Sequence, residues 1–115
     1  MKVYDNEENG KVLEEYARVV NRLLAPATDL TCCILGMVGE AGEVADEYKK
    51  QVYNGWPSNL QKLDTEVGDL LFYIQAYCVL RGVEMADLMC ENMYKLNKRY
   101  PNGFVPGGGE RSHER

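Results

Sequence analysis

The chain has 115 residues, of which 45% are hydrophobic and 27% are charged. This composition is typical of one folded domain and argues against a disordered chain. Its formal net charge of −5 argues against a protein that binds duplex nucleic acid through a broad basic surface. A small phosphorylated ligand stays compatible with this charge if metal ions bridge acidic side chains and phosphate.

Features of membrane, secreted and disulfide-bonded proteins are not expected. Residues 1–8 contain no apolar segment of the kind that a secretory signal needs. The longest apolar run, residues 70–80, is too short to span a bilayer and contains Gln75. The cysteines have no C-x-x-C spacing and no neighbouring histidine, which favours buried, reduced thiols. They are Cys32, Cys33, Cys78 and Cys90. We therefore expect a cytoplasmic protein with no membrane partner.

Two helices are predicted in the first half of the chain. Apolar residues at helical spacing predict a first helix that begins between Asp5 and Gly10 and ends before Pro26. A second helix is predicted to run from Thr28, as its N-cap, to about Tyr53.

Glycines and acidic residues share the middle of this second helix. Each glycine costs about 1 kcal/mol relative to alanine in a helix interior. The three are Gly36, Gly39 and Gly42. Close approach of a neighbouring helix or of a ligand usually compensates for such glycines, and tight helix packing alone is the simpler alternative. Between them, Glu40 and Glu43 lie on one helix face, about 60° apart.

A short loop that contains Trp56 leads into a third predicted helix. Ser58 and Gln61 form a capping-box pattern at its start, and Gly82 is a stop signal. Because the loop is short, the second and third helices should be antiparallel neighbours. Residues 70–80 are apolar nearly all round, so we expect a second chain to cover them.

Two pairs of acidic residues should face each other in this helical hairpin. Glu66 and Asp69 repeat on the third helix the spacing of Glu40 and Glu43 on the second. Four carboxylates that converge between helices would repel one another unless cations hold them. Carboxylate oxygens suit Mg²⁺ or Mn²⁺. Since no Ser-His or Cys-His arrangement is present, metal-activated water is the available nucleophile.

A fourth helix is predicted to end at Arg99, with Asn92, Lys95 and Arg99 on one stripe. A basic stripe near a helix C-terminus is usually solvated and interacts favourably with the helix dipole. On these residues alone, that is the simpler interpretation. Residues 105–115 are expected to form a flexible tail, so that one domain spans residues 1–104.

The motifs of the last three predicted helices resemble those of a known family. They are E-x-x-E at Glu40 and Glu43, E-x-x-D at Glu66 and Asp69, and N-x-x-K at Asn92 and Lys95. In this order they resemble the signature of the MazG-type nucleotide pyrophosphohydrolases of the all-α NTP pyrophosphatase superfamily. The resemblance covers roughly residues 16–104. One departure is Gly39, where many members carry a further glutamate.

The resemblance implies an all-α bundle of four to five helices that is completed by dimerisation, in a homodimer or homotetramer. It implies hydrolysis of a nucleoside triphosphate, deoxy or non-standard, to the monophosphate and pyrophosphate. Mg²⁺ would be the cofactor, and Mn²⁺ could substitute for it. The alternatives are a phosphoribosyl-ATP or dCTP/dUTP-type pyrophosphatase of the same superfamily, or a non-catalytic bundle that senses nucleotides.

The resemblance also implies roles for particular residues. The four acidic positions match the family's magnesium ligands: Glu40, Glu43, Glu66 and Asp69. Glu43 is our candidate for the carboxylate that orients or deprotonates the attacking water. Asn92 and Lys95 match positions that bind phosphate, and Arg99 would assist them. The base pocket would lie between helices and use the first helix and Trp56.

Overall fold

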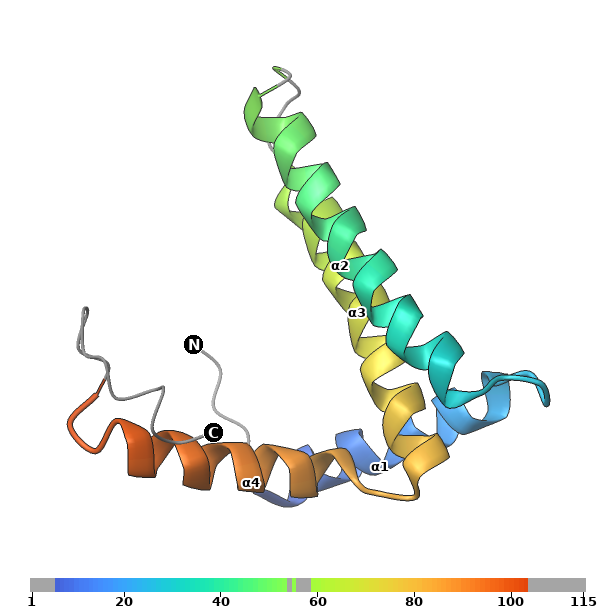
Figure 1. Cartoon of the computed structure of the whole chain (residues 1–115), viewed down its shortest axis with the longest axis vertical. Coiled ribbons are helices and arrows are strands. Elements are labelled where there is room, and N and C mark those ends of the chain that lie inside the picture. The colour runs from blue at the N-terminus through green and yellow to red at the C-terminus, as the bar shows by residue number, and fades with distance from the viewer. Residues whose placement is uncertain (1–5, 54, 56–58, 104–115) are drawn as a thin grey trace. The chain divides into compact units, whose positions relative to one another are not determined.

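The computed structural model describes residues 6–53, 55 and 59–103. These residues form four helices and no strand, which confirms the all-α class (Figure 1). The helices are α1 (Asn6–Leu23), α2 (Leu30–Tyr53), α3 (Leu60–Arg81) and α4 (Met85–Arg99). Trp56 and the predicted tail over residues 105–115 lie outside the described residues.

Contacts divide the chain into two compact units, Met1–Val83 and Glu84–Arg115. The first holds α1, α2 and α3, and the second holds α4. A single domain over residues 1–104 therefore stays a prediction. Of the helices described, none is long and apolar enough to cross a membrane.

Two helix caps lie one residue later than predicted. The Asp29 side chain accepts a hydrogen bond from the Cys32 backbone N–H at 2.8 Å, so Asp29 caps α2 in place of Thr28. This bond is also the main reason why the pKa of Asp29 is lowered. Asn59 accepts a bond from the Lys62 backbone N–H at 3.0 Å and is the N-cap of α3. In both places two residues able to cap are adjacent in the sequence, and sequence alone does not choose between them.

The predicted stop of α3 is confirmed. Gly82 has a left-handed backbone with φ of 67°, a conformation that glycine adopts without steric cost. The Gly82 N–H donates to the Val79 carbonyl at 3.2 Å, and the Val83 N–H donates to the Cys78 carbonyl at 3.0 Å. These bonds satisfy carbonyls at the end of the helix.

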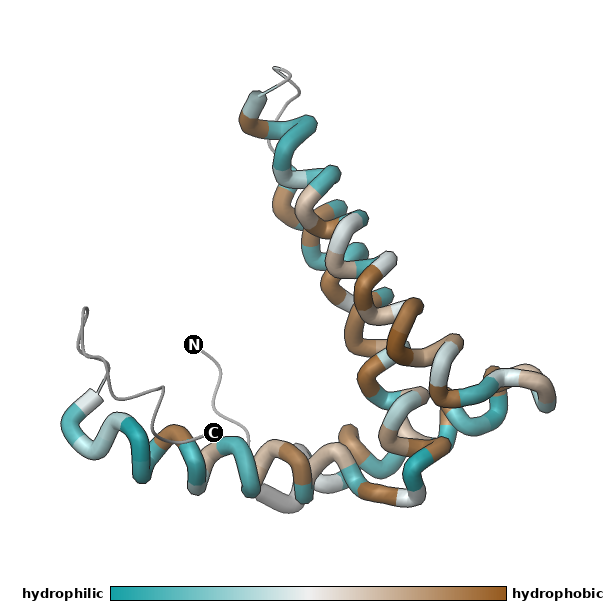
Figure 2. Tube along the Cα trace, viewed as in Figure 1, coloured by the Kyte–Doolittle hydropathy of each residue, from teal (hydrophilic) through white to brown (hydrophobic). Residues whose placement is uncertain are grey.

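One small core joins the three helices of the first unit. Val20 of α1, Cys33 of α2 and Ala76 of α3 are fully buried against one another. Figure 2 shows that hydrophobic residues are concentrated in the first half of α2, while its second half is more hydrophilic. The core therefore holds α1 against one end of the α2–α3 pair and leaves the other end to polar contacts.

Only part of the apolar surface is buried within the first unit. Leu35 and Val38 of α2 are 64% and 67% exposed, and Leu71 of α3 is 44% exposed. The cysteine prediction was right for two residues, since Cys33 and Cys78 are buried and reduced, and burial raises the pKa of both thiols. It was wrong for Cys32 and Cys90, which are free but exposed.

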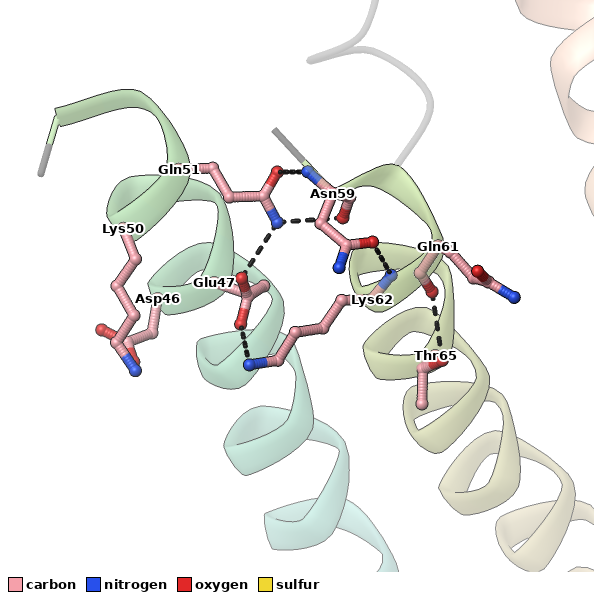
Figure 3. A network of polar contacts seen from close by, with 8 residues as sticks. All are labelled: Asp46, Glu47, Lys50, Gln51, Asn59, Gln61, Lys62 and Thr65. Carbon is pink, nitrogen blue, oxygen red and sulfur yellow. Dashed lines mark hydrogen bonds and ion pairs between the residues drawn. The ribbon is translucent and has the colours of Figure 1, made fainter. Parts of the chain in front are cut away.

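A polar network ties the end of α2 to the start of α3 (Figure 3). The Glu47 carboxylate accepts a hydrogen bond from the Gln51 side-chain amide at 2.9 Å and pairs with the Lys62 ammonium at 3.2 Å. The same Gln51 amide donates to the Asn59 carbonyl at 3.0 Å and accepts from the Asn59 N–H at 2.9 Å. We call Glu47, Gln51, Asn59 and Lys62 the polar clasp.

The polar clasp should make stability depend on pH. The pKa of Glu47 lies below its ordinary value of 4.5, first because Gln51 donates to it and then because Lys62 pairs with it. Because the folded-state pKa is the lower one, the stabilisation by charged Glu47 is present above the ordinary value and is lost as pH falls through the folded value. We expect Glu47→Gln to lower the Tm at neutral pH, with a difference from wild type that shrinks below pH 4.5. Thermal unfolding between about pH 3 and pH 7 measures this, and a difference independent of pH would contradict it.

Candidate metal centre

Three of the four predicted metal ligands come together between α2 and α3. Carboxylate oxygens of Glu40, Glu66 and Asp69 lie within 4.8 Å of one another. Glu40 and Glu66 are half-buried and Asp69 is exposed. The structure does not bring Glu43 into this group, and its side chain is exposed one turn along α2. We call Glu40, Glu66 and Asp69 the acidic group.

The position of these side chains follows from the helix pairing. The acids lie three residues apart on each helix, so each pair occupies one face, and α2 and α3 run antiparallel along each other (Figure 1). The half-buried Glu40 and Glu66 lie at the contact between the helices, whereas Asp69 lies at its solvent edge. A ligand can therefore reach the acidic group from solvent.

Electrostatic repulsion within the acidic group is visible in Glu40. Its pKa is raised above the ordinary value, first because of burial and then because of the negative charges of Asp69, Glu66 and Glu43. A charged carboxylate at this position is disfavoured unless a positive charge is nearby. A bound cation would supply that charge.

The donor set fits a hard divalent cation. Carboxylate oxygens around Mg²⁺ lie about 2.0–2.1 Å from the ion, which puts neighbouring ligands about 3 Å apart and opposite ligands about 4.2 Å apart. Three oxygens that lie within 4.8 Å of one another are near enough for side-chain rotations to bring them to these separations. The acidic group could therefore hold Mg²⁺ or Mn²⁺, and half of its coordination shell would stay available for water or phosphate.

Close helix approach explains only one of the three glycines of α2. A side chain at Gly36 would overlap the ring of Tyr73 on α3, so the aromatic ring lies directly on the α2 backbone there. At Gly39 and Gly42, no atom lies within 4 Å of an added Cβ. The same is true of Gly68, beside Asp69 on α3. Close helix packing is thus confirmed for Gly36, whereas at Gly39 and Gly42 the approach of a ligand stays a prediction.

Tyr16 connects α1 to the site. It packs against the buried core, and its pKa is raised, first by burial and then by the negative charge of Asp69. Its hydroxyl therefore stays protonated at neutral pH and can donate a hydrogen bond.

The predicted phosphate-binding residues belong to the second unit. Asn92 and Lys95 are exposed on α4. Arg99 is half-buried, and its guanidinium lies 6.0 Å from the centre of the Tyr100 ring. These three residues share one stripe of α4, as predicted. Trp56, the predicted base contact, is not among the described residues.

Sequence reasoning missed the polar clasp next to the site. Glu47 was visible as a third acid on the stripe of Glu40 and Glu43, but nothing in the sequence showed that Lys62 would neutralise it. The signal that could have found this pair is the spacing, because Lys62 precedes Asp69 by the same seven residues by which Glu47 follows Glu40. In an antiparallel pair, equal and opposite steps of this kind bring residues face to face.

Comparisons with known proteins identify the family of this chain. The family model described as "MazG nucleotide pyrophosphohydrolase domain" matches residues 29–104, which include both acidic motifs and the N-x-x-K motif. The chain is 29% identical over 85 residues to the "Gene 37 protein" of Mycobacterium phage L5, an alignment that covers 70% of this chain and 75% of that protein. No solved structure matches. Since the family model covers more than half of the chain, the chain belongs to the MazG nucleotide pyrophosphohydrolase domain family.

Proposed function

We propose that this protein hydrolyses the α–β phosphoanhydride bond of a nucleoside triphosphate, deoxy or non-canonical, and releases a nucleoside monophosphate and pyrophosphate. Membership of the MazG family supports nucleotide pyrophosphohydrolase activity in general. The observation that carries the proposal to particular residues is the convergence of Glu40, Glu66 and Asp69. A triphosphate is strongly anionic, so three carboxylates serve such a substrate only by holding cations between themselves and the phosphates.

The acidic residues of α2 and α3 would have two different roles, metal binding and activation of the attacking water. Glu40, Glu66 and Asp69 hold the metal, and the metal when bound neutralises phosphate charge and acts as a Lewis acid. Glu43 lies one turn from Glu40 and is exposed, outside the acidic group. It is therefore free to orient the attacking water and accept its proton. Tyr16 is near enough to Asp69 for the negative charge of Asp69 to raise its pKa, and its protonated hydroxyl can donate a hydrogen bond.

The residues of the N-x-x-K motif would supply the phosphate contacts. Asn92 and Lys95 occupy the N-x-x-K motif of α4, and their exposed side chains are accessible to a ligand. Arg99 lies one turn beyond Lys95 and adds a further positive charge to the same stripe. Trp56 would stack on the base. Amide and ammonium donors of this kind suit phosphate oxygens.

A second copy of the chain would complete the bundle. Large apolar side chains stay exposed on both α2 and α3, among them Leu35, Val38 and Leu71. Contiguous apolar surface on a folded unit marks an interaction site, and most homo-oligomers are symmetric. We propose a homodimer or homotetramer that works in the cytoplasm, with neither nucleic acid nor membrane as partner.

Pyrophosphate release tests the proposed reaction directly. The purified protein is assayed with Mg²⁺ against a panel of ribonucleoside and deoxyribonucleoside triphosphates, non-canonical triphosphates and phosphoribosyl-ATP. Comparison of kcat/KM across the panel separates a dNTP or non-canonical NTP enzyme from a phosphoribosyl-ATP or dCTP/dUTP-type enzyme. If no substrate yields pyrophosphate, the enzyme assignment fails and a nucleotide-sensing bundle becomes the better description.

Metal binding should stabilise the fold through the acidic group. We expect Mg²⁺ or Mn²⁺ to raise the Tm of the wild-type protein by several degrees, because a ligand at 100 times its Kd stabilises by about 2.7 kcal/mol. Asp69→Asn should lose most of this increase. Asp64→Asn is the matched control, since Asp64 is an exposed acid on α3 outside the acidic group. Equal metal-induced shifts in the two variants would contradict the assignment.

A further inference from the structure

The contacts between α2 and α3 all follow from one axial alignment of the two antiparallel helices. Moving from Glu47 back to Glu40 takes seven residues along α2, and moving from Lys62 forward to Asp69 takes seven residues along α3. Glu47 pairs with Lys62, and Glu40 meets Asp69 in the acidic group. Seven residues are close to two helical turns. The clasp and the acidic group are therefore successive levels of a single helix–helix contact.

The same alignment of α2 and α3 also accounts for a contact on the other side of the acidic group. Gly36 lies four residues before Glu40, and Tyr73 lies four residues after Asp69. These two residues are also in contact, since the Tyr73 ring occupies the space where a side chain at Gly36 would be. The acidic group is thus bracketed, with the Gly36–Tyr73 contact about one turn away on one side and the clasp about two turns away on the other.

The polar clasp fixes the helices along their axes more firmly than an exposed ion pair would. Glu47 is only 5% exposed, and both of its carboxylate oxygens are used, one by Gln51 and one by Lys62. Gln51 also bonds both the N–H and the carbonyl of Asn59 (Figure 3). Because Asn59 is the N-cap of α3, these bonds set where α3 begins relative to α2.

A small axial shift would damage the acidic group. One residue of helix rises 1.5 Å, while Mg²⁺ ligands must lie within a few tenths of an ångström of about 2.1 Å. Glu40 comes from one helix, whereas Glu66 and Asp69 come from the other. The geometry of the donor set therefore depends directly on the axial alignment of α2 and α3.

We infer that Lys62 and Gln51 are positioning residues for the metal centre, which act through Glu47 and Asn59 to hold α2 and α3 in the alignment that brings Glu40 to Glu66 and Asp69. Neither is one of the ligands. This inference rests on the proposed function, since it assumes that the acidic group binds the metal that the reaction needs.

The effect of Lys62→Met on cation affinity distinguishes a positioning role of Lys62 from a purely electrostatic one. Lys62 is a positive charge one turn from Glu66, so its removal by Lys62→Met should strengthen cation binding if charge alone acts. If Lys62 positions the ligands, its removal should weaken cation binding. Gln51→Leu changes no charge and should weaken it as well. Lys62→Arg keeps the charge and should retain most of the affinity.

The test is a calorimetric titration of Mn²⁺ into the metal-free protein without nucleotide. We expect the Kd to rise about tenfold in Lys62→Met and Gln51→Leu, as for other partners that orient metal ligands. Lys49→Met is the matched control, because it removes an exposed positive charge of α2 that is not part of the clasp. Its Kd should equal that of wild type. Circular dichroism establishes that each variant is folded.

Two results would overturn the inference. One is a Kd that is unchanged or lower in Lys62→Met, and the other is an equal change in Lys49→Met. Failure of the proposed reaction has a different signature, because a wild-type protein that binds Mn²⁺ but releases no pyrophosphate fails only as an enzyme. Conversely, a wild-type enzyme whose clasp variants keep the wild-type Kd fails only in the inferred positioning.

Discussion

Asp69→Asn should lower kcat/KM roughly a thousandfold or more with any substrate that the wild type hydrolyses. The change replaces the carboxylate of a proposed metal ligand by a neutral amide of the same shape. Asp69 is the exposed member of the acidic group and lies at its solvent edge, where a triphosphate would arrive. Loss of its charge would remove both a proposed metal ligand and part of the attraction for the cation. Steady-state pyrophosphate release at saturating Mg²⁺ measures the effect.

The same variant should not be less stable without metal. Negative charge on Asp69 contributes to the raised pKa of Glu40, which means that the charged forms repel each other in the folded protein. Because removal of one charge relieves this repulsion, the Tm of Asp69→Asn in a chelator should equal or exceed that of wild type. Asp64→Asn should keep full activity. Retained activity in Asp69→Asn would show that the acidic group is not the reaction site.

Glu43→Gln should impair turnover without impairing metal binding, unlike substitutions in the acidic group. Glu43 is exposed and lies outside the acidic group, so the variant should keep most of the Mg²⁺-induced rise in Tm while losing turnover about a hundredfold or more. This combination identifies a residue that handles the attacking water. Loss of both properties in equal measure would instead make Glu43 a metal ligand.

The sequence predicted the helices well because their cues are local. Apolar spacing and stop signals such as Gly82 depend on a few neighbouring residues, and α1, α3 and α4 end where these cues place them. The caps failed by one residue where two capping residues are adjacent, as at Thr28 and Asp29. There the choice depends on which side chain reaches the third backbone N–H, and the sequence does not contain that geometry.

The site was predicted in part for a related reason. A spacing of three residues puts two acids on one helix face, but it does not say how deeply each side chain enters the helix contact. Glu40 and Glu66 enter it, while Glu43 does not. The partnership of Glu47 with Lys62 depends on the alignment of two helices, which only the folded hairpin defines. Local pattern thus identified the residue types, and helix pairing decided which of them meet.

Gly36→Ala should destabilise the protein and impair the metal centre together. The added methyl group would overlap the Tyr73 ring, so the helices must move apart or the ring must rotate. Overpacking of this kind costs about 1–3 kcal/mol, against a gain of about 1 kcal/mol in helix propensity. Tyr73 lies one turn from Asp69, so the displaced helix would carry a proposed metal ligand with it. Urea unfolding and Mn²⁺ titration measure the two effects.

Gly39→Ala and Gly42→Ala are the matched controls on the same helix. No atom lies within 4 Å of an added Cβ at either position, so each should stabilise the protein by about 0.5–1 kcal/mol through helix propensity alone. The close contact at Gly36 also predicts that a substitution of Tyr73 compensates for part of the stability lost in Gly36→Ala. Tyr73→Ala should cost less stability in the Gly36→Ala background than in wild type, because the second change removes the ring that the first one strikes. Additive effects of the two substitutions would show that the aromatic ring does not set the spacing of α2 and α3.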